Sequence, residues 1–279
     1  MKNVGLIGCG TIGCEIARSI DNQQIPSAKL SFMVDTSTDR LGFVNSTLRN
    51  EKPIIFSDPE SLFRSDVYKG THIVVESASR AAVRQYARKI LSSGKHLIIF
   101  SIGELIDEKF MKELESLAVV NAAVIHIPTG AIAGIDAIKA VRSQLDRLVI
   151  STTKSPKSLA GAPFFKMHRD IILSNLSVKT VLYEGSVQEA IELFPSNVNV
   201  SAALALAIGD IDKILVRILV DPSIDVNRHE IVACGKFGVL QITANNTPHV
   251  DNPKTSMLAV LSGIESVRSA CSETIRIGS

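Results

Sequence analysis

The 279-residue sequence lacks several features that mark particular classes of protein. Its charges nearly cancel, because 30 lysines and arginines face 28 aspartates and glutamates and leave a formal net charge of +2. This balance favours neither nucleic acid nor an acidic membrane surface as a partner. We find no internal repeat, no low-complexity tract and no apolar stretch of about 20 residues without charge, so the sequence predicts neither a repeat protein nor a transmembrane helix.

Cysteine is scarce and its positions form no ligand pattern. The four cysteines are Cys9, Cys14, Cys234 and Cys271. They make no CxxC pair and no cluster with histidine, and the six histidines show no metal-ligand spacing, so we expect no catalytic metal. The apolar N-terminus resembles a signal peptide, but Glu15 and Arg18 interrupt it at once. We therefore expect a cytoplasmic protein, whose cysteines are small buried side chains in a reducing compartment.

The first half of the chain alternates short apolar runs with helical patterns. We expect strands over 4–7, 30–34, 73–75, 97–100 and 124–127, and helices over 11–20, 60–64, 80–91 and 108–117. Strands that are apolar throughout and separated by helices predict a parallel sheet that is covered on both faces.

The pattern changes after Pro128. The segment over 129–134 is rich in small residues and is typical of a hinge or loop, and we expect a helix over 135–143 after it. The later strands are longer and β-branched, and antiparallel pairing is the simplest arrangement for them, with helices over 187–193 and 200–208 on one face. These strands are expected over 148–153, 178–183, 213–220, 229–234 and 239–243. A last helix over 253–267 has no strand after it, so we expect it to pack back on the first half.

A glycine-rich turn follows the first expected strand. Residues 8–13 read Gly-Cys-Gly-Thr-Ile-Gly and match the G-x-G-x-x-G pattern of dinucleotide-binding turns. The turn directly follows a strand and opens a helix, which is the context that the pattern requires. Gly8 would permit the tight turn, Gly10 would let the backbone approach a pyrophosphate, and Gly13 would let the helix lie close to the sheet.

The helix that begins at Thr11 and Ile12 would turn its N–H groups toward these phosphates. Asp35 ends the second expected strand, 35 − 13 = 22 residues after Gly13, where a carboxylate accepts hydrogen bonds from the adenine ribose. Because a carboxylate there repels a 2′-phosphate, NAD is favoured over NADP. Arg40 lies nearby and could weaken this preference. The pattern itself does not separate nicotinamide from flavin cofactors, and we expect nicotinamide because it is the commoner of the two.

These observations predict an α/β fold with two domains. A Rossmann dinucleotide-binding domain would span 1–128 and be completed by the C-terminal helix within 253–279. An α+β domain for substrate binding and dimerisation would span 129–252. A broad sheet with few charges on one face would suit a homodimer.

Several segments together resemble the L-aspartate dehydrogenase family. They are residues 129–138 (TGAIAGIDAI), 194–200 (FPSNVNV), 228–231 (RHEI), 252–256 (NPKTS) and 76–79 (ESAS), with the glycine turn. The resemblance covers nearly the whole chain, although the family has serine in place of Thr129 and alanine in place of Ser77 and Ser201. Residues 39–59 form a longer insertion relative to the family, and no role follows for it. It implies reversible NAD(P)-dependent oxidation of L-aspartate to iminoaspartate, which water converts to oxaloacetate and ammonia. In some members the imine feeds quinolinate and hence NAD synthesis.

The resemblance also implies roles for single residues. His229 carries over as the active-site histidine, and its ordinary pKa of about 6.5 suits proton transfer near neutral pH. The other interpretation is a strand histidine paired with Glu230. Asn199 and Ala133 match contacts to the nicotinamide, although Asn199 also suits a helix N-cap. Ala78, within the 76–79 segment, is expected to contact the cofactor.

Three further candidate residues come from position alone. Lys154 could pair with a substrate carboxylate, or it could be a solvated surface lysine. Ser101 and Gly103 follow the fourth expected strand, where the cofactor crevice should open.

Other functions remain open at this point. Dihydrodipicolinate reductase and homoserine dehydrogenase have a similar two-domain plan, but the histidine and lysine signature of the first and the lysine–aspartate constellation of the second are not found. A non-catalytic NAD-sensing protein on the same fold is the alternative of a different class, because a fold does not fix a function.

Overall fold

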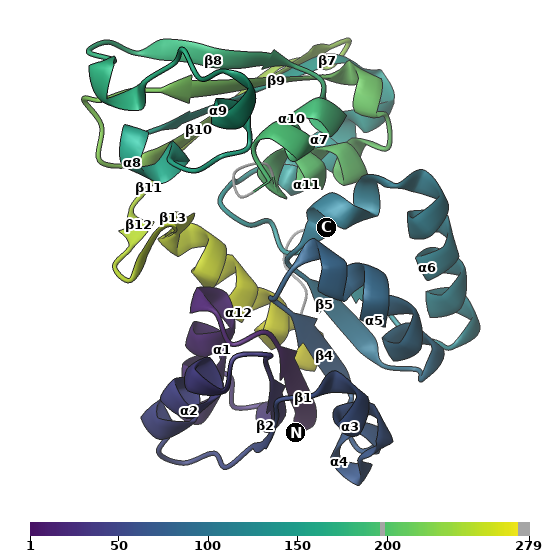
Figure 1. Cartoon of the computed structure of the whole chain (residues 1–279). Helices are drawn as coiled ribbons and strands as arrows, with labels where there is room; N and C mark the ends of the chain where they lie inside the picture. The colour runs from purple at the N-terminus through teal and green to yellow at the C-terminus, as the bar shows by residue number, and fades with distance from the viewer. Residues whose placement is uncertain (196–198, 273–279) are drawn as a thin grey trace. The chain divides into compact units, whose positions relative to one another are not determined.

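The computed structural model describes residues 1–195 and 199–272. The chain forms two compact units (Figure 1). Unit 1 comprises Met1–Pro128 together with the C-terminal stretch from Val260, and unit 2 comprises Thr129–Ala259.

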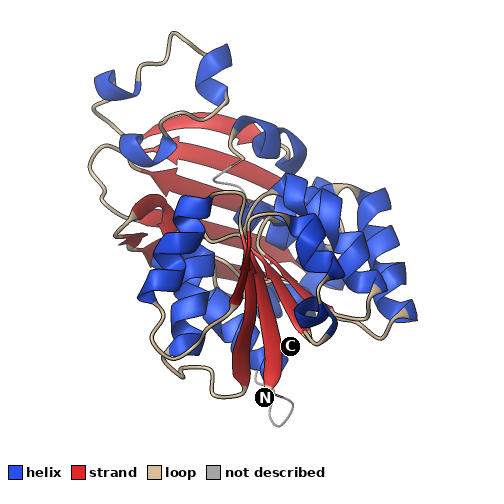
Figure 2. Cartoon of the chain, turned by 60° about the horizontal axis from the view of Figure 1, so that its bottom comes forward, coloured by secondary structure: helices blue, strands red, loops and turns tan. Residues whose placement is uncertain are grey.

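Unit 1 is built on a six-stranded sheet in the order β3-β2-β1-β4-β5-β6. Its strands are β1 (Lys2–Ile7), β2 (Ala28–Val34), β3 (Ile54–Phe56), β4 (Ile73–Glu76), β5 (His96–Ile99) and β6 (Ile125–His126). All neighbouring strands are parallel, and Figure 2 shows them as a fan with helices on both sides. The strand order reverses beside β1, which is where a sheet of this kind binds its ligand, beyond the carboxyl ends of the strands.

The helices of unit 1 begin at polar caps. They are α1 (Thr11–Asp21), α2 (Thr38–Thr47), α3 (Pro59–Arg64), α4 (Asp66–Lys69), α5 (Arg80–Ser92) and α6 (Glu108–Val120), with a 3₁₀ turn over Ile102–Ile106. Five of the six helices, all except α1, start at a serine or aspartate whose side chain accepts a backbone N–H of the first turn.

The insertion over 39–59 contains two elements that the pattern did not predict. Helix α2 buries only Leu41 and Val44, so its sequence carries little apolar periodicity. Strand β3 is three residues long at the sheet edge, where Ile54 and Ile55 are half exposed. Together they extend the sheet beyond β2.

The C-terminal helix starts later than expected. Residues 253–256 belong to β13 (Asn252–Ser256), which pairs with β12 (Pro248–His249), and α12 runs over Met257–Cys271. The expected helix start at 253 is therefore wrong, because the Asn252 side chain accepts the N–H of Lys254 and holds a turn. Within unit 1 the helix lies close to Phe100, since a Cβ on Gly263 would come 2.3 Å from that ring.

Unit 2 contains a five-stranded sheet in the order β11-β10-β7-β9-β8. Its strands are β7 (Leu145–Lys154), β8 (Thr180–Gly185), β9 (Ile214–Val220), β10 (Asn227–Gly235) and β11 (Gly238–Asn246). Three of the neighbouring pairs are antiparallel, but β7 and β9 are parallel. Antiparallel pairing was therefore the wrong expectation for that one pair. The long connection over 155–213 gives the chain room to return in the same direction.

Unit 2 also contains several helices, some of which cover one face of this second sheet. They are α7 (Ile135–Val141), α8 (Pro156–Leu159), α9 (Phe164–Met167), α10 (Val187–Leu193) and α11 (Asn199–Ile208). Helix α10 packs on β8 and β9, and α11 packs on both α7 and α10. Strand β9 accordingly alternates between buried and half-buried residues along its length.

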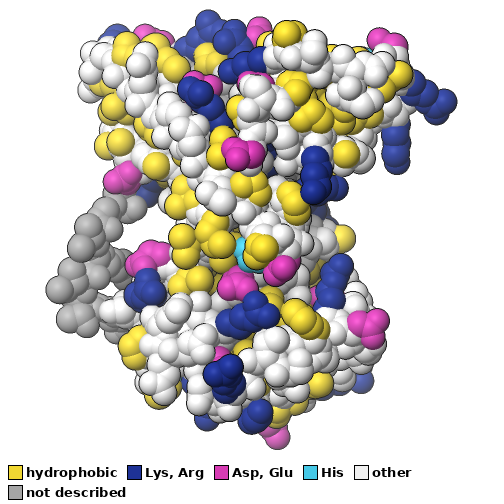
Figure 3. All heavy atoms as spheres, turned by 90° about the vertical axis from the view of Figure 1, so that its left-hand side faces the viewer, with side chains coloured by type: hydrophobic (Ala, Val, Ile, Leu, Met, Phe, Trp, Pro, Cys, Tyr) yellow, Lys and Arg dark blue, Asp and Glu magenta, His cyan; other side chains and the backbone are white. Residues whose placement is uncertain are grey.

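The surface carries charges of both signs. Figure 3 shows lysine and arginine side chains scattered among acidic and apolar ones on the face in view, as the near-zero net charge predicts. Among the helices of the described residues, none combines the length with the apolar character needed to cross a bilayer.

Candidate active site

The glycine turn between β1 and α1 has a geometry that fits a dinucleotide phosphate. Gly8 has a φ of +98°, and a Cβ there would lie 2.7 Å from the backbone nitrogen of Ala78. A Cβ on Gly13 would lie 2.0 Å from the Gly8 carbonyl oxygen, so α1 can approach the turn only without a side chain at this position. A Cβ on Gly10 would meet no atom within 4 Å. The space beside Gly10 is therefore open to a ligand.

The start of α1 differs from the other helix starts of unit 1. Gly10 caps it without a side-chain hydrogen bond, and Thr11 and Ile12 in the first turn are half-buried. A helix start without a side-chain cap suits an anion, which is attracted by the N–H groups and by the helix dipole.

Asp35 lies beside the same turn. One carboxylate oxygen accepts the N–H of Cys9 at 2.7 Å, and the other accepts the N–H of Ser37 at 2.9 Å. Each oxygen of a carboxylate can accept a further hydrogen bond, so the half-buried Asp35 can still receive a ribose hydroxyl. The carboxylate therefore also helps to hold the glycine turn in place, a contribution that the sequence did not predict.

Glu76, at the end of β4, is a buried carboxylate to which the sequence assigned no role. Its oxygens accept the N–H groups of Ala78 at 2.8 Å, Ser79 at 2.9 Å and Ser101 at 3.1 Å, and the Ser101 hydroxyl at 2.9 Å. Burial raises the pKa of Glu76, and these hydrogen bonds oppose that rise. Glu76 thus brings Ala78 and Ser101, two of the expected cofactor contacts, to one carboxylate. The sequence signal that could have identified Glu76 is an acidic residue at the end of an apolar strand.

In unit 2, the strand register creates a gradient of polarity on the covered face of the sheet. A first row across β11, β10, β7 and β9 is apolar and contains Ile242, Ile231, Ile150 and Val216. The next row contains Ala244, His229, Thr152 and Ile218. At the end of the strands lie Asn246, paired with Asn227, and Lys154, paired with Val220. Polar side chains therefore gather at one end of this face.

His229 is at the centre of this polar group. It is 3% exposed, and its Nδ1 is hydrogen-bonded to the Thr152 hydroxyl at 2.9 Å. Burial, and secondly the charge of Lys154, lower the pKa of His229 to about 3. The ordinary pKa expected from the sequence therefore does not apply here, and His229 is neutral at pH 7.

Lys154 is a buried cation. It is 3% exposed, so it is not the solvated surface lysine that the sequence left open. Its ammonium group donates to the Lys254 carbonyl oxygen at 3.4 Å, and no carboxylate of the described residues forms an ion pair with it. Burial, and then the charge of Lys254, lower its pKa to about 8. A buried cation without a counter-charge is a natural site for an anionic ligand.

The two expected nicotinamide contacts lie in unit 2. Ala133 is exposed and sits in the loop between Gly130 and Gly134, which both have positive φ. Asn199 is exposed and is the first residue of α11. Residues 196–198 of the 194–200 motif lie outside the described residues. The roles of Ala133 and Asn199 remain predictions.

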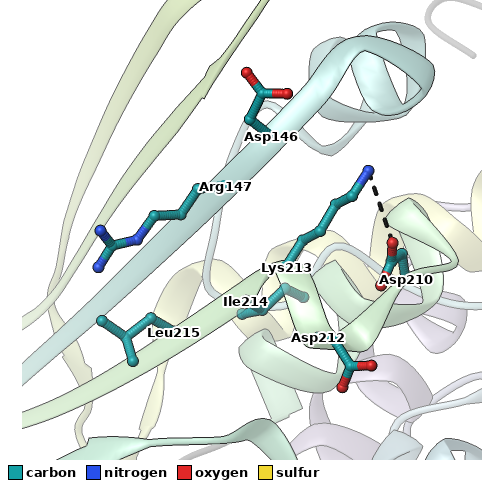
Figure 4. Close-up of a pocket in the computed structure, with 7 residues that line it drawn as sticks. All are labelled: Asp146, Arg147, Asp210, Asp212, Lys213, Ile214 and Leu215. Carbon is teal, nitrogen blue, oxygen red and sulfur yellow. Dashed lines mark ion pairs between the residues drawn. The ribbon is translucent and has the colours of Figure 1, made fainter.

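A surface pocket of about 550 Å³ opens at the other end of the same sheet. It is lined by Asp146, Arg147, Asp210, Asp212, Lys213, Ile214 and Leu215 (Figure 4). Lys213 turns toward Asp210, 3.7 Å away. Because this pocket lies where β7 and β9 begin, the length of the strands separates it from Lys154.

Known proteins match both halves of the chain. Residues 136–270 match the protein-family model described as aspartate dehydrogenase, C-terminal. Residues 8–128 match the one described as homoserine dehydrogenase, NAD binding domain. An L-aspartate dehydrogenase of Nitrosopumilus maritimus is 41% identical over 278 residues, which cover 100% of both chains. The chain belongs to the L-aspartate dehydrogenase family.

Further matches agree with this membership. An L-aspartate dehydrogenase of Methanocella arvoryzae is 37% identical, again over 100% of both chains. The crystal structure of aspartate dehydrogenase from Thermotoga maritima aligns with a TM-score of 0.75 at 27% identity, covering 100% of both chains. A myo-inositol dehydrogenase of Lactobacillus plantarum, at 12% identity and a TM-score of 0.56, covers 97% of this chain and 88% of its own and shows only a shared fold.

The comparisons confirm the expected family, the α/β fold class and the NAD-binding assignment of the first half. They also separate this chain from the homoserine dehydrogenase alternative. The model with that description matches only the NAD-binding half, and the second half matches aspartate dehydrogenase.

Proposed function

We propose that this protein catalyses the NAD-dependent oxidation of L-aspartate to iminoaspartate, which water converts to oxaloacetate and ammonia. The observation that carries the proposal is the buried Lys154 ammonium group, which has no carboxylate partner among the described residues and shares its sheet face with the Thr152–His229 pair. A carboxylate of the substrate supplies the missing counter-charge. The family of the chain supports this substrate.

The polar group of unit 2 then binds the substrate and manages its proton. The α-ammonium must lose a proton before an imine can form. His229 is neutral at pH 7 and can accept a proton, which a cationic imidazole could not do. Negative charge on a bound dicarboxylate raises the pKa of both His229 and Lys154, because opposite charge favours the protonated form of each. Substrate binding therefore prepares His229 for the reaction.

Unit 1 binds the cofactor in this proposal. NAD, when bound, accepts the hydride from Cα of the amino acid. The open space beside Gly10 receives the pyrophosphate, next to Thr11 and Ile12 at the start of α1. Asp35 accepts the ribose hydroxyls and disfavours NADP. Glu76 holds Ala78 and Ser101 in position through three hydrogen bonds.

We also propose a cytoplasmic homodimer. None of the four cysteines forms a disulfide bond in the described structure, as suits a reducing compartment. The sheet face opposite His229 carries Val181, Val232 and Val239, which are 54%, 36% and 60% exposed. A second copy of the chain would remove these valines from water. Light scattering coupled to size-exclusion chromatography tests the dimer.

The test of the activity is the absorbance of reduced nicotinamide in the presence of NAD and a panel of substrates. We expect turnover with L-aspartate and little with L-malate, L-alanine or L-homoserine, because L-alanine and L-homoserine lack the second carboxylate and L-malate lacks the ammonium group. Equal activity on a monocarboxylic amino acid would contradict L-aspartate as the specific substrate but would not contradict dehydrogenase activity. Binding of NAD without turnover of any substrate would favour an NAD-sensing protein.

A further inference from the structure

Asn227, at the start of β10, is a fully buried amide with an unused oxygen. The residue is 0% exposed, and Oδ1 has no hydrogen-bond partner in the described structure. Native proteins seldom leave a buried polar atom unpaired, because its contact with water is lost and nothing replaces it. No sequence pattern predicted a role for this asparagine, and neither the fold nor the family match explains its free oxygen.

The other half of the amide fixes which atom is free. Asn227 Nδ2 donates to the Pro253 carbonyl oxygen at 3.4 Å and to the Ser256 hydroxyl at 3.3 Å. A carbonyl oxygen can only accept a hydrogen bond, so the amide nitrogen must face Pro253. The oxygen, and not the nitrogen, is therefore the atom left without a partner.

Register places this oxygen beside the proposed substrate site. Arg228 pairs with Thr153 in the antiparallel β10–β7 ladder. One step further along both strands, Asn227 comes opposite Lys154 on the same face of the sheet. His229 lies two residues from Asn227 on β10 and therefore shares that face. The amide of Asn227, the ammonium group of Lys154 and the imidazole of His229 therefore lie at the same end of one face of the sheet.

The chemistry of this group matches an amino acid with two carboxylates. Lys154 can donate to one carboxylate, and the Lys254 ammonium group is close enough for its charge to lower the pKa of Lys154. An amide oxygen cannot bind a carboxylate, because both are acceptors, but it accepts readily from an ammonium N–H. The described residues of the group offer no carboxylate for that ammonium.

We propose that Asn227 Oδ1 accepts a hydrogen bond from the α-ammonium of the substrate and so selects an amino acid over the corresponding plain dicarboxylate. The inference rests on the proposed function and adds the residue that recognises the amine. Asn227 cannot take the proton itself, so it holds the nitrogen while His229 receives the proton. Lys154 contributes equally to the binding of both kinds of dicarboxylate.

A surface cavity borders the same segment of chain. It has a volume of about 240 Å³ and is lined in part by Ser158 and Lys254. The Pro253 carbonyl oxygen connects it to Asn227, since it accepts from Asn227 Nδ2 and from the Ser158 hydroxyl. The segment over 253–254 therefore lies beside both the cavity and the unused oxygen.

The experiment compares L-aspartate with succinate, which has the two carboxylates but no amine. In the full-length protein with NAD, Asn227→Ala should lower kcat/KM for L-aspartate about 10- to 100-fold, the usual effect of losing a hydrogen bond to a charged group. The competitive inhibition constant of succinate should stay unchanged. Lys154→Met should weaken both ligands.

Two controls separate recognition from a structural role. Ser256→Ala removes one partner of Asn227 Nδ2 but keeps Oδ1, so the preference for L-aspartate over succinate should persist. Asn227→Asp keeps an acceptor oxygen at the same place, so the preference for L-aspartate over succinate should persist, although its negative charge beside Lys154 should weaken the binding of both dicarboxylates. If circular dichroism shows that Asn227→Ala is unfolded, the same comparison is made on Asn227→Ser, whose hydroxyl is too short to reach.

The outcomes are distinct. Equal weakening of L-aspartate and succinate in Asn227→Ala, or no weakening of either, would contradict this inference while leaving an active wild-type enzyme intact. A wild-type protein that does not oxidise L-aspartate would contradict the proposed function itself.

Discussion

The Thr152 hydroxyl and Nδ1 of His229 are 2.9 Å apart, although the two residues are separated by 77 positions in the sequence. They face each other across the β7–β10 ladder and are both buried. The hydroxyl holds the imidazole in one orientation and occupies only one of its two nitrogens, so the other is available for the proposed proton transfer.

Replacing His229 tests its place in the reaction. His229→Ala should lower kcat about 10²- to 10⁴-fold, the usual contribution of an acid–base group, and should leave NAD affinity by calorimetry unchanged. Thr152→Val keeps the volume but loses the hydroxyl, so it should cause a smaller loss of kcat. Near-normal turnover by His229→Ala would show that the histidine is structural and that another group, such as Lys154 or a bound water, handles the proton.

The low pKa of His229 makes stability depend on pH. Because burial lowers this pKa to about 3, the unfolded chain binds a proton below its ordinary pKa of about 6.5 that the folded chain does not bind. The free energy of unfolding should therefore fall as the pH drops from about 6.5 toward 3, by at most about 1.4 kcal/mol per pH unit from this residue. Urea denaturation of the wild type and of His229→Asn at several pH values measures this change in the free energy of unfolding. Parallel curves for the two proteins would refute the lowered pKa.

Two glycines of the same turn should respond differently to alanine. A methyl group on Gly13 would collide with the backbone of Gly8, 2.0 Å away, whereas one on Gly10 meets nothing within 4 Å. Gly13→Ala should therefore lower the melting temperature, and Gly10→Ala should melt like the wild type but bind NAD weakly. Unaltered NAD affinity in Gly10→Ala would argue against a pyrophosphate at this position.

Asp35 should set the choice between the two nicotinamide cofactors. Asp35→Ser should weaken NAD binding tenfold or more, because a hydrogen bond to a charged group contributes about 1.5–3 kcal/mol. It should also reduce the difference in affinity between NAD and NADP. The Asp35 carboxylate also accepts the N–H of Cys9, so Asp35→Asn, which keeps an acceptor oxygen for that bond, is the matched control. Titration of both cofactors by calorimetry gives the ratio of their dissociation constants. The same NAD affinity in Asp35→Ser would remove this residue from the site.

Much of unit 1 could be predicted because its signals are local. The strands of its sheet alternate with helices along the chain, and the glycines that identify the turn over residues 8–13 lie close together in the sequence. Among the elements that escaped prediction, α2 and β3 bury few side chains and so leave a weak pattern. In unit 2, local patterns located the strands, but the parallel pairing of β7 with β9 joins segments far apart in sequence.

The sequence by itself determined the family, the dinucleotide turn and His229 as the residue to examine, because each depends on residue identities at short spacing. Only the tertiary structure decided the chemical state of the site. The low pKa of His229, the unpaired charge of Lys154 and the free oxygen of Asn227 all arise from burial. Burial depends on which distant strands and segments come to lie over a side chain, and no local pattern of residues carries that information.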